Sequence, residues 1–215
     1  MNRLLTLLAA AVTMGLAGSA VGQDAPPRHG ISVFGDLKYT DGFAHFDYVN
    51  PDAPKGGSIK LPGLDTFETL HPFILKGRKE ILAEALLFDT LMARSFDEPD
   101  SYYGLVAKTV EQPADKTWVA FNIDPRAKFH DGSAITADDI VFTFNTLKKD
   151  GHPRYRINFR DVDRAEATSA SRVKFTFKPG THRDLPTRLA SLPVLSKAYY
   201  DKVEGTSNNA LLPED

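Results

Sequence analysis

The chain contains no cysteine among its 215 residues and only one tryptophan. Without cysteine it can form no disulfide, no thiolate ligand for a metal and no thioether link to a lipid. Its 26 basic and 28 acidic residues leave a net charge of −2, which does not favour non-specific binding to nucleic acid. We therefore expect neither a lipid anchor nor a nucleic-acid partner.

The six histidines show no pattern typical of a metal site, because no two of them stand three or four residues apart. The pair His130-Asp131 invites a catalytic interpretation, but a triad needs a base, an orienting acid and a nucleophile that meet in space. A turn at Asp131-Gly132 explains the pair without chemistry. No phosphate-binding loop or nucleophile elbow is present either. We expect no catalytic residue, no metal and no cofactor.

The one long apolar run stands at the N-terminus. A positive start precedes residues 4–16, which are predominantly apolar, and small residues follow as far as Gly22. This run is too short to span a bilayer comfortably, and the three-part layout is that of a secretory signal peptide. We predict cleavage after Gly22, with residues 23–28 as a flexible lead. Cleavage after Ala20 and a retained N-terminal helix are the alternatives. Export without an anchor favours the periplasm.

A strand and a turn are predicted in the middle of the chain. Residues 118–123 alternate so that Val119, Phe121 and Ile123 share one face, which predicts a strand with one face more buried than the other. The Asp131-Gly132 pair that follows is a turn signal.

A helix is predicted directly after this turn. Thr136 can accept a backbone N–H and Asp139 stands three residues on, which is a variant of the capping box at the positive end of the helix dipole. Phe142 points away from the apolar stripe of this helix, so we expect cover on more than one side. The stripe consists of Ile140, Phe144 and Leu147, with Val141 beside it.

Further elements are predicted from similar patterns. Residues 79–94 are expected to form a helix, and residues 172–178 a half-exposed strand. A short strand is expected at residues 58–61, and short helices at 184–192 and 196–203. Because helices and strands mix without strict alternation, we predict an α+β (mixed α/β) fold.

Several of these segments resemble a known family. Residues 118–144, with Lys-Phe-His-Asp-Gly at their centre, resemble the signature of the extracellular solute-binding proteins of family 5, the peptide- and nickel-binding subunits of ABC importers. The aromatic, glycine-rich residues 29–39 and 45–57 are similar to the oligopeptide-binding branch that also takes up microcin-C-type peptides. Residues 192–197, with Tyr199-Tyr200 after them, resemble the family's return into its first lobe.

The resemblance implies a clamp of two lobes, of the periplasmic-binding-protein type II-like kind, of which this chain holds an N-terminal fragment. Residues 29–84 would begin the first lobe, 85–178 would form the inserted small domain, and 179–215 would return to the first lobe. The second lobe, which carries the family's acidic partner of a peptide amino terminus, would be absent. We therefore expect incomplete cover over four leucines of the return segment, Leu185, Leu189, Leu192 and Leu195.

The resemblance also implies a cleft-lining segment at residues 70–78, in which Leu70 and Pro72 keep a Leu-x-Pro element. Glycine at position 77 suits a close backbone approach to an extended ligand. The two basic residues of this segment depart from the neutral or acidic residues common there, so ligand preference is in doubt. The alternatives are ordinary surface charges and, for Phe67, a place in the core. The candidate ligand-binding residues are Thr66, Phe67, Lys76, Gly77 and Arg78.

By the same resemblance, the chain is expected to be part of a periplasmic receptor that captures oligopeptides by clamp closure, is monomeric at full length and serves an ABC importer permease. A receptor of the same fold for nickel, haem or oligosaccharide is the alternative within the class. A secreted hydrolase and an inactive remnant are the others, and the lack of a recognisable nucleophile argues against the hydrolase. Because a clamp needs both walls, we expect this chain alone to bind peptides very weakly or not at all, and the full-length protein to bind them well.

Overall fold

The computed structural model describes residues 25–61, 66–73, 77–180 and 183–204. The predicted signal peptide, its cleavage site, Lys76 and the end of the return segment beyond residue 204 lie outside these residues. Within the described ranges, no helix is long and apolar enough to cross a membrane.

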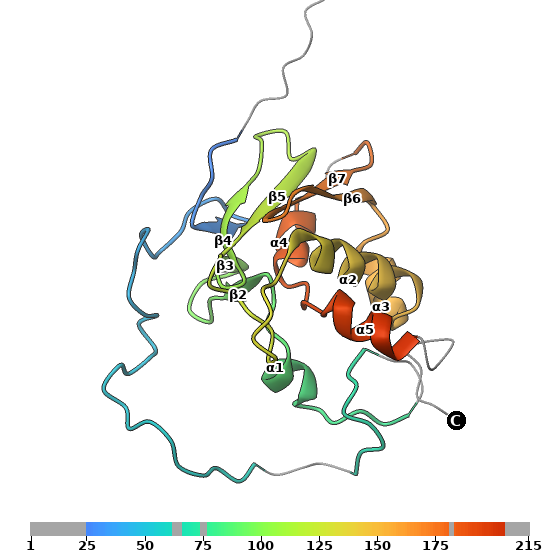
Figure 1. The fold of residues 1–215 in the computed structure, drawn as a ribbon. Coiled ribbons are helices and arrows are strands. Elements are labelled where there is room, and N and C mark those ends of the chain that lie inside the picture. The colour runs from blue at the N-terminus through green and yellow to red at the C-terminus, as the bar shows by residue number, and fades with distance from the viewer. Residues whose placement is uncertain (1–24, 62–65, 74–76, 181–182, 205–215) are drawn as a thin grey trace, which may run out of the picture.

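A four-stranded antiparallel sheet forms the larger layer (Figure 1). Its order is β4 (Ala107–Glu111), β5 (Trp118–Ile123), β7 (Arg172–Phe177) and β6 (Val162–Ser169). The strands predicted at 118–123 and 172–178 are confirmed as β5 and β7. Val119 lies opposite Phe175 and Phe121 lies opposite Val173, and all four side chains are fully buried. These cross-strand pairs of branched and aromatic side chains stabilise the sheet and fix its register.

A smaller antiparallel sheet lies beside the first, in the order β1 (Gly30–Ser32), β3 (Ser101–Gly104) and β2 (Met92–Arg94) (Figure 1). Arg28, two residues before β1, extends the neighbouring sheet, because its backbone exchanges two hydrogen bonds with Val110 in β4, at 2.8 and 2.9 Å. Arg28 was expected in the flexible lead, and this backbone pairing holds it against β4.

Helix α2 (Ala137–Lys149) packs on β6 and β7. The predicted capping box is confirmed: Asp139 N–H donates to Thr136 Oγ1 at 3.4 Å, and Thr136 N–H donates to Asp139 Oδ2 at 2.9 Å. The predicted stripe of Ile140, Phe144 and Leu147 is buried. Phe142 lies against the ring of Tyr200 at a centroid distance of 5.8 Å, so α2 is covered on a second side as expected.

Three short helices follow α2 in the described residues. They are α3 (Pro153–Asn158), α4 (Leu185–Ala190) and α5 (Lys197–Glu204). The helices predicted at 184–192 and 196–203 are confirmed as α4 and α5, whereas α3 was not predicted.

The helix predicted at 79–94 is wrong over most of its length. Only α1 (Ala83–Leu87) is helical, and β2 begins at Met92. The chain between them is extended because Leu91 N–H donates to the carbonyl of Leu192 at 3.0 Å. The carbonyl of Leu91 accepts from Ala107 N–H at 2.8 Å. Backbone pairing with distant segments therefore outweighs the helical pattern in the local sequence.

The strand predicted at 58–61 is also wrong. These residues have no regular structure, and the side chain of Ile59 is 80% exposed. A strand needs a neighbour to pair its backbone groups. Within the described residues, no segment pairs with this one, and residues 50–61 run in the open, away from both sheets (Figure 1).

One continuous core joins the two sheets and the helices. The expectation of incomplete cover over the return segment is wrong, because its four leucines are only 0–5% exposed. Elements of this chain cover them: α4 packs against β3, and the backbone after α4 pairs with residues 89–91. The core takes side chains from all three predicted lobe segments, and the boundaries at 84 and 178 stay a prediction.

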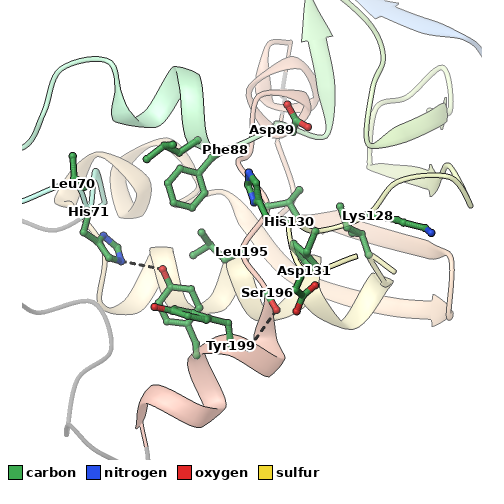
Figure 2. Close-up of a pocket in the computed structure, with 15 residues that line it drawn as sticks. Leu70, His71, Phe88, Asp89, Lys128, His130, Asp131, Leu195, Ser196 and Tyr199 are labelled. Carbon is green, nitrogen blue, oxygen red and sulfur yellow. Dashed lines mark hydrogen bonds between the residues drawn. The ribbon is translucent and has the colours of Figure 1, made fainter. Parts of the chain in front are cut away.

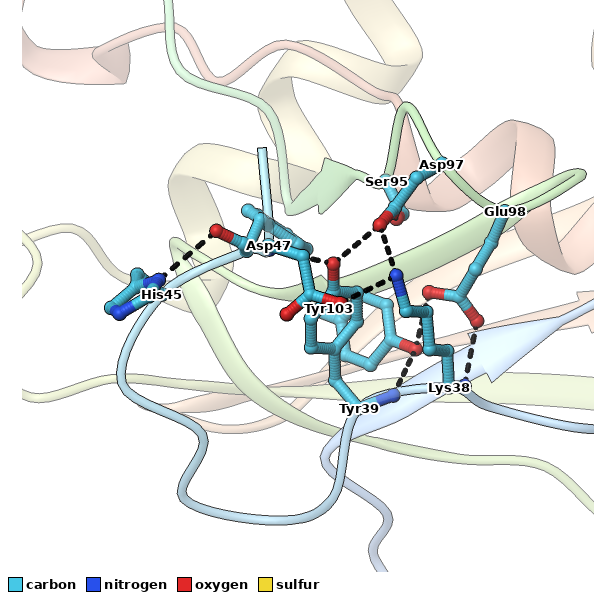
Figure 3. Close-up of polar contacts among 9 residues, drawn as sticks. Lys38, Tyr39, His45, Asp47, Ser95, Asp97, Glu98 and Tyr103 are labelled. Carbon is cyan, nitrogen blue, oxygen red and sulfur yellow. Dashed lines mark hydrogen bonds and ion pairs between the residues drawn. The ribbon is translucent and has the colours of Figure 1, made fainter. Parts of the chain in front are cut away.

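Polar contacts fasten residues 38–47 to the loop after β2 and to Tyr103 in β3 (Figure 3). Lys38 Nζ lies 2.7 Å from a carboxylate oxygen of Asp47 and 2.6 Å from one of Asp97. These two carboxylates raise the pKa of Lys38 well above its usual value, and Lys38 holds the pKa of Asp97 well below its own. Tyr103 O–H donates to Glu98 at 2.7 Å. The same Tyr103 oxygen accepts from the backbone N–H of Tyr39 at 3.2 Å. We call these residues, with Tyr39, the fastening cluster.

Candidate functional site

A pocket of about 450 Å³ lies between the end of α1, the turn at residues 128–131 and the start of α5 (Figure 2). Apolar and aromatic side chains form most of its wall, and polar groups stand among them. The apolar part consists of Leu70, Leu87, Phe88, Phe129, Ile135, Val194, Leu195, Tyr199 and Tyr200. The polar part consists of His71, Asp89, Lys128, His130, Asp131 and Ser196.

His71 and Tyr200 are hydrogen-bonded at one side of this pocket, at 2.9 Å (Figure 2). Burial lowers the pKa of His71 and raises that of Tyr200 to about 12, so both groups are neutral near pH 7. Phe73 N–H points at His71 Nδ1 at 3.4 Å, which assigns the ring proton to Nε2. His71 therefore donates to Tyr200, and the Tyr200 O–H proton is left to donate to a bound molecule.

The turn at His130-Asp131 is structural, as predicted. Asp131 Oδ1 accepts from Ser133 N–H at 2.9 Å and from Ser133 Oγ at 2.6 Å, and these bonds lower the pKa of Asp131. Gly132 has a φ of +84°, the left-handed conformation that favours glycine. Ser196 is the serine that lines this pocket, and its Oγ accepts from Tyr199 N–H. Among the described residues, no base is hydrogen-bonded to it.

The predicted ligand-binding residues that the structure describes lie next to the pocket in sequence but do not line it. Residues 68–69 pair with residues 78–80, because Glu68 N–H donates to Arg78 O at 2.7 Å. Gly77 has a φ of +78°, so its own backbone conformation favours glycine. Phe67 is 54% exposed, which removes the core alternative for it. Thr66 lies on the same exposed stretch.

Leu70 and His71, from that same segment, do line the pocket. His71 is the middle residue of the Leu-x-Pro element, so the element itself could have pointed to it. The tyrosine pair at 199 and 200 was a second signal within the return segment. Asp89 carried no local signal, because it stood inside the predicted helix 79–94.

The described residues contain no group of three histidine, aspartate or glutamate side chains that could hold a metal ion.

Residues 101–212, just over half of the chain, match the model of the bacterial extracellular solute-binding proteins, family 5 Middle. The chain belongs to this family. This confirms the predicted resemblance, and the family is one of substrate-binding receptors. Peptidoglycan-binding protein YepA of Agrobacterium fabrum is 41% identical to this family member over 213 residues, which cover 94% of this chain and 34% of the relative.

A second relative from Agrobacterium fabrum is named "Probable peptide-binding protein YejA". It is 37% identical over 198 residues, which cover 92% of this chain and 32% of the relative. The chain thus spans about a third of the length of the curated relatives it matches.

A solved structure shows the fold. The oligopeptide-binding protein AppA from Bacillus subtilis, in complex with a nonapeptide, superposes with a TM-score of 0.51 over 68% of this chain and 28% of that one, at 20% identity. The predicted mixed α/β fold, of the periplasmic-binding-protein type II-like kind and present in part, is confirmed.

Proposed function

We propose that this solute-binding protein is a periplasmic receptor that captures oligopeptides and delivers them to an ABC importer permease. The observation that carries the proposal is its 37% identity, over nearly the whole chain, to a relative named as peptide-binding. The fold alone would not do so, because one fold serves many ligands.

The pocket supports this proposal chemically. Its volume of about 450 Å³ and its mostly apolar wall are usual for a small-molecule site. The Tyr200 O–H can donate to a peptide carbonyl, and the apolar wall can take peptide side chains. Clamp closure would then cover the ligand from the other side and exclude water. We further propose that Thr66, Phe67, Lys76, Gly77 and Arg78 contact the part of the peptide that extends beyond the pocket.

A second candidate is a peptidoglycan fragment, favoured by the 41% identity to a relative named as peptidoglycan-binding. Such fragments carry short peptides attached to amino sugars, so the two candidates share a peptide portion. They differ in whether the sugar contributes to binding.

The test is native mass spectrometry of the protein purified from the periplasm without denaturation, followed by calorimetry. Defined tripeptides, muropeptides and the sugar alone serve as ligands. We expect peptide masses on the protein and binding of peptides without the sugar. Binding that requires the sugar would favour the second candidate, and a bound nickel or haem mass would contradict both.

Export is proposed with the function. In a two-membrane host, the mature chain should begin at or near Gln23, because the small-residue exit of the leader ends at Gly22. N-terminal sequencing of the periplasmic protein checks this. An intact Met1 in the cytoplasmic fraction would contradict it.

A further inference from the structure

Two segments of the pocket wall are held by a third segment that does not line the pocket. Residues 70–71 supply one part of the wall and residues 87–89 another (Figure 2). The third segment is α3, whose first turn contains Arg154 and Tyr155. Neither of these is among the described residues that line the pocket. Any effect of α3 on the pocket must therefore pass through the two wall segments.

Helix α1 leads into residues 87–89 and has little support of its own. It has five residues and, within the described part of the chain, no side-chain cap at its start. Ala83 is its one buried residue, and Leu86 is 71% exposed. A helix this short does not keep its shape in water by its own hydrogen bonds. The position of Phe88, directly after α1, therefore depends on what holds α1.

An ion pair with α3 holds α1. Arg154 Nη2 lies 2.8 and 2.6 Å from the two carboxylate oxygens of Glu84 in α1. The Tyr155 hydroxyl accepts from Arg154 at 2.7 Å and donates to the same carboxylate at 3.4 Å. The side chains of Arg154 and Glu84 are 37% and 38% exposed, so water screens their attraction only in part. Two side chains of α3 thus converge on one carboxylate of α1.

The start of α3 also holds the other wall segment. The backbone N–H of His152, the residue before α3, donates to the carbonyl of Phe73 at 2.9 Å. The ring of Phe73 is fully buried, with its centroid 6.2 Å from that of Tyr155 and 4.8 Å from that of Phe88. Phe73 stands two residues after His71 of the wall. The start of α3 therefore fixes both wall segments relative to each other.

We propose that Arg154 is a positioning residue of the binding site. It holds Glu84 of α1 and so sets the place of Phe88 in the pocket wall, without touching the ligand. Loss of the ion pair frees α1 to shift, and the contact of Phe88 with Phe73 is then no longer fixed. A wall that has to be ordered again on binding costs affinity. The inference rests on the proposed function and deepens it, since it identifies what keeps the peptide pocket in shape.

The test measures the binding of a set of defined tripeptides to the full-length protein by calorimetry. Arg154→Met removes the charge and keeps most of the side-chain length, and it should weaken binding roughly three- to tenfold. Arg154→Lys keeps the charge and should retain most of the affinity. Arg160→Met makes the same substitution at an arginine that pairs with Asp161 instead, and this control should bind as wild type does.

A charge exchange separates positioning from loss of the fold. Glu84→Arg and Arg154→Glu should each weaken binding, because each single variant places two like charges together. The double variant exchanges the two charges and should return the affinity to within about twofold of wild type. Urea unfolding of every variant accompanies the calorimetry. A contact that is only structural would lower stability and leave the affinity of the folded protein unchanged.

The failures of the inference and of the proposed function are distinguishable. If wild type binds the tripeptides and Arg154→Met binds them as tightly, the inference is overturned and the proposed function stands. The same conclusion follows if the exchanged pair binds as weakly as the single variants. If full-length wild type binds none of the tripeptides, both are overturned.

Discussion

Residues 107–177 form strands and helices whose apolar faces pack on one another, whereas residues 33–61 contain neither helix nor strand. In the first region, α2 buries an apolar stripe and the four-stranded sheet buries an apolar face, and the apolar residues of both recur at regular spacing in the sequence. In the second, the fastening cluster and a few rings hold an irregular chain. Regular burial distributes stability over many contacts, so loss of a large core side chain costs free energy of the whole domain. A fastened loop depends on a few bonds, so their loss should release the loop alone.

The largest expected effect lies in the core under α2. Phe144 is 2% exposed and packs on Phe175 at a centroid distance of 5.3 Å. Phe144→Ala should lower the free energy of unfolding by about 3–5 kcal/mol, because it leaves a cavity that the surroundings fill only in part. Urea unfolding followed by circular dichroism measures this. Phe96→Ala, at a side chain that is 83% exposed, is the matched control and should change stability by under about 0.5 kcal/mol. Equal losses of stability in the two variants would contradict the expected difference between the packed core and the loops.

The second effect concerns the fastening cluster. Tyr103→Phe removes the oxygen that accepts from Tyr39 N–H, and a buried donor left without a partner costs about 1–2 kcal/mol. Hydrogen exchange should accelerate over residues 38–47 and change little in β5 and β7. Tyr48→Phe makes the same chemical change at a half-exposed ring and should leave exchange as in wild type. Faster exchange throughout the sheet would show that loop and core unfold together.

The third effect tests the helix start. Thr136→Ala breaks the capping box and should cost about 1 kcal/mol in urea unfolding. Thr146→Ala makes the same substitution inside α2, where alanine favours the helix, and should be neutral or slightly stabilising. If the two variants behave alike, the cap contributes nothing and the helix depends on packing alone.

The smallest effect is a pH dependence at the pocket. Burial lowers the pKa of His71, so the folded state binds a proton less readily than the unfolded one. This contribution to stability is present above the histidine's unfolded pKa of about 6.5 and is lost as pH falls through the lower folded value. Stability should therefore fall more between pH 7 and 5 in wild type than in His71→Gln. Tyr200→Phe keeps the buried histidine and should keep the pH dependence. If the stability of His71→Gln shows the same pH dependence as wild type, other groups cause that dependence.

Local sequence patterns predicted the structure correctly where the tertiary contacts of the segment favoured the same structure. The alternation of β5 and β7 and the Thr136–Asp139 cap each depend on residues close in sequence, and the structure confirms all three. Residues 79–94 show the opposite case. Their apolar spacing suits a helix, but Leu91 pairs with Leu192, a residue about a hundred positions away that no local rule takes into account.

The candidate site could be predicted only in part for the same reason. Its wall comes from four segments, at 70–71, 87–89, 128–135 and 194–200, that meet only when the chain is folded. The resemblance indicated the first as part of a cleft-lining segment, and the last only as the return into the first lobe. It gave no sign that Asp89 would line this pocket.

By itself, the sequence determined the family, the mixed α/β class, the strands at β5 and β7 and the start of α2, because short-range periodicity and capping depend on neighbouring residues. Tertiary structure alone decided where the predicted helix at 79–94 stops, which leucines of the return segment are buried, and which charged side chains line the pocket. Those features depend on contacts between distant segments, whose free energy exceeds the small differences in local propensity.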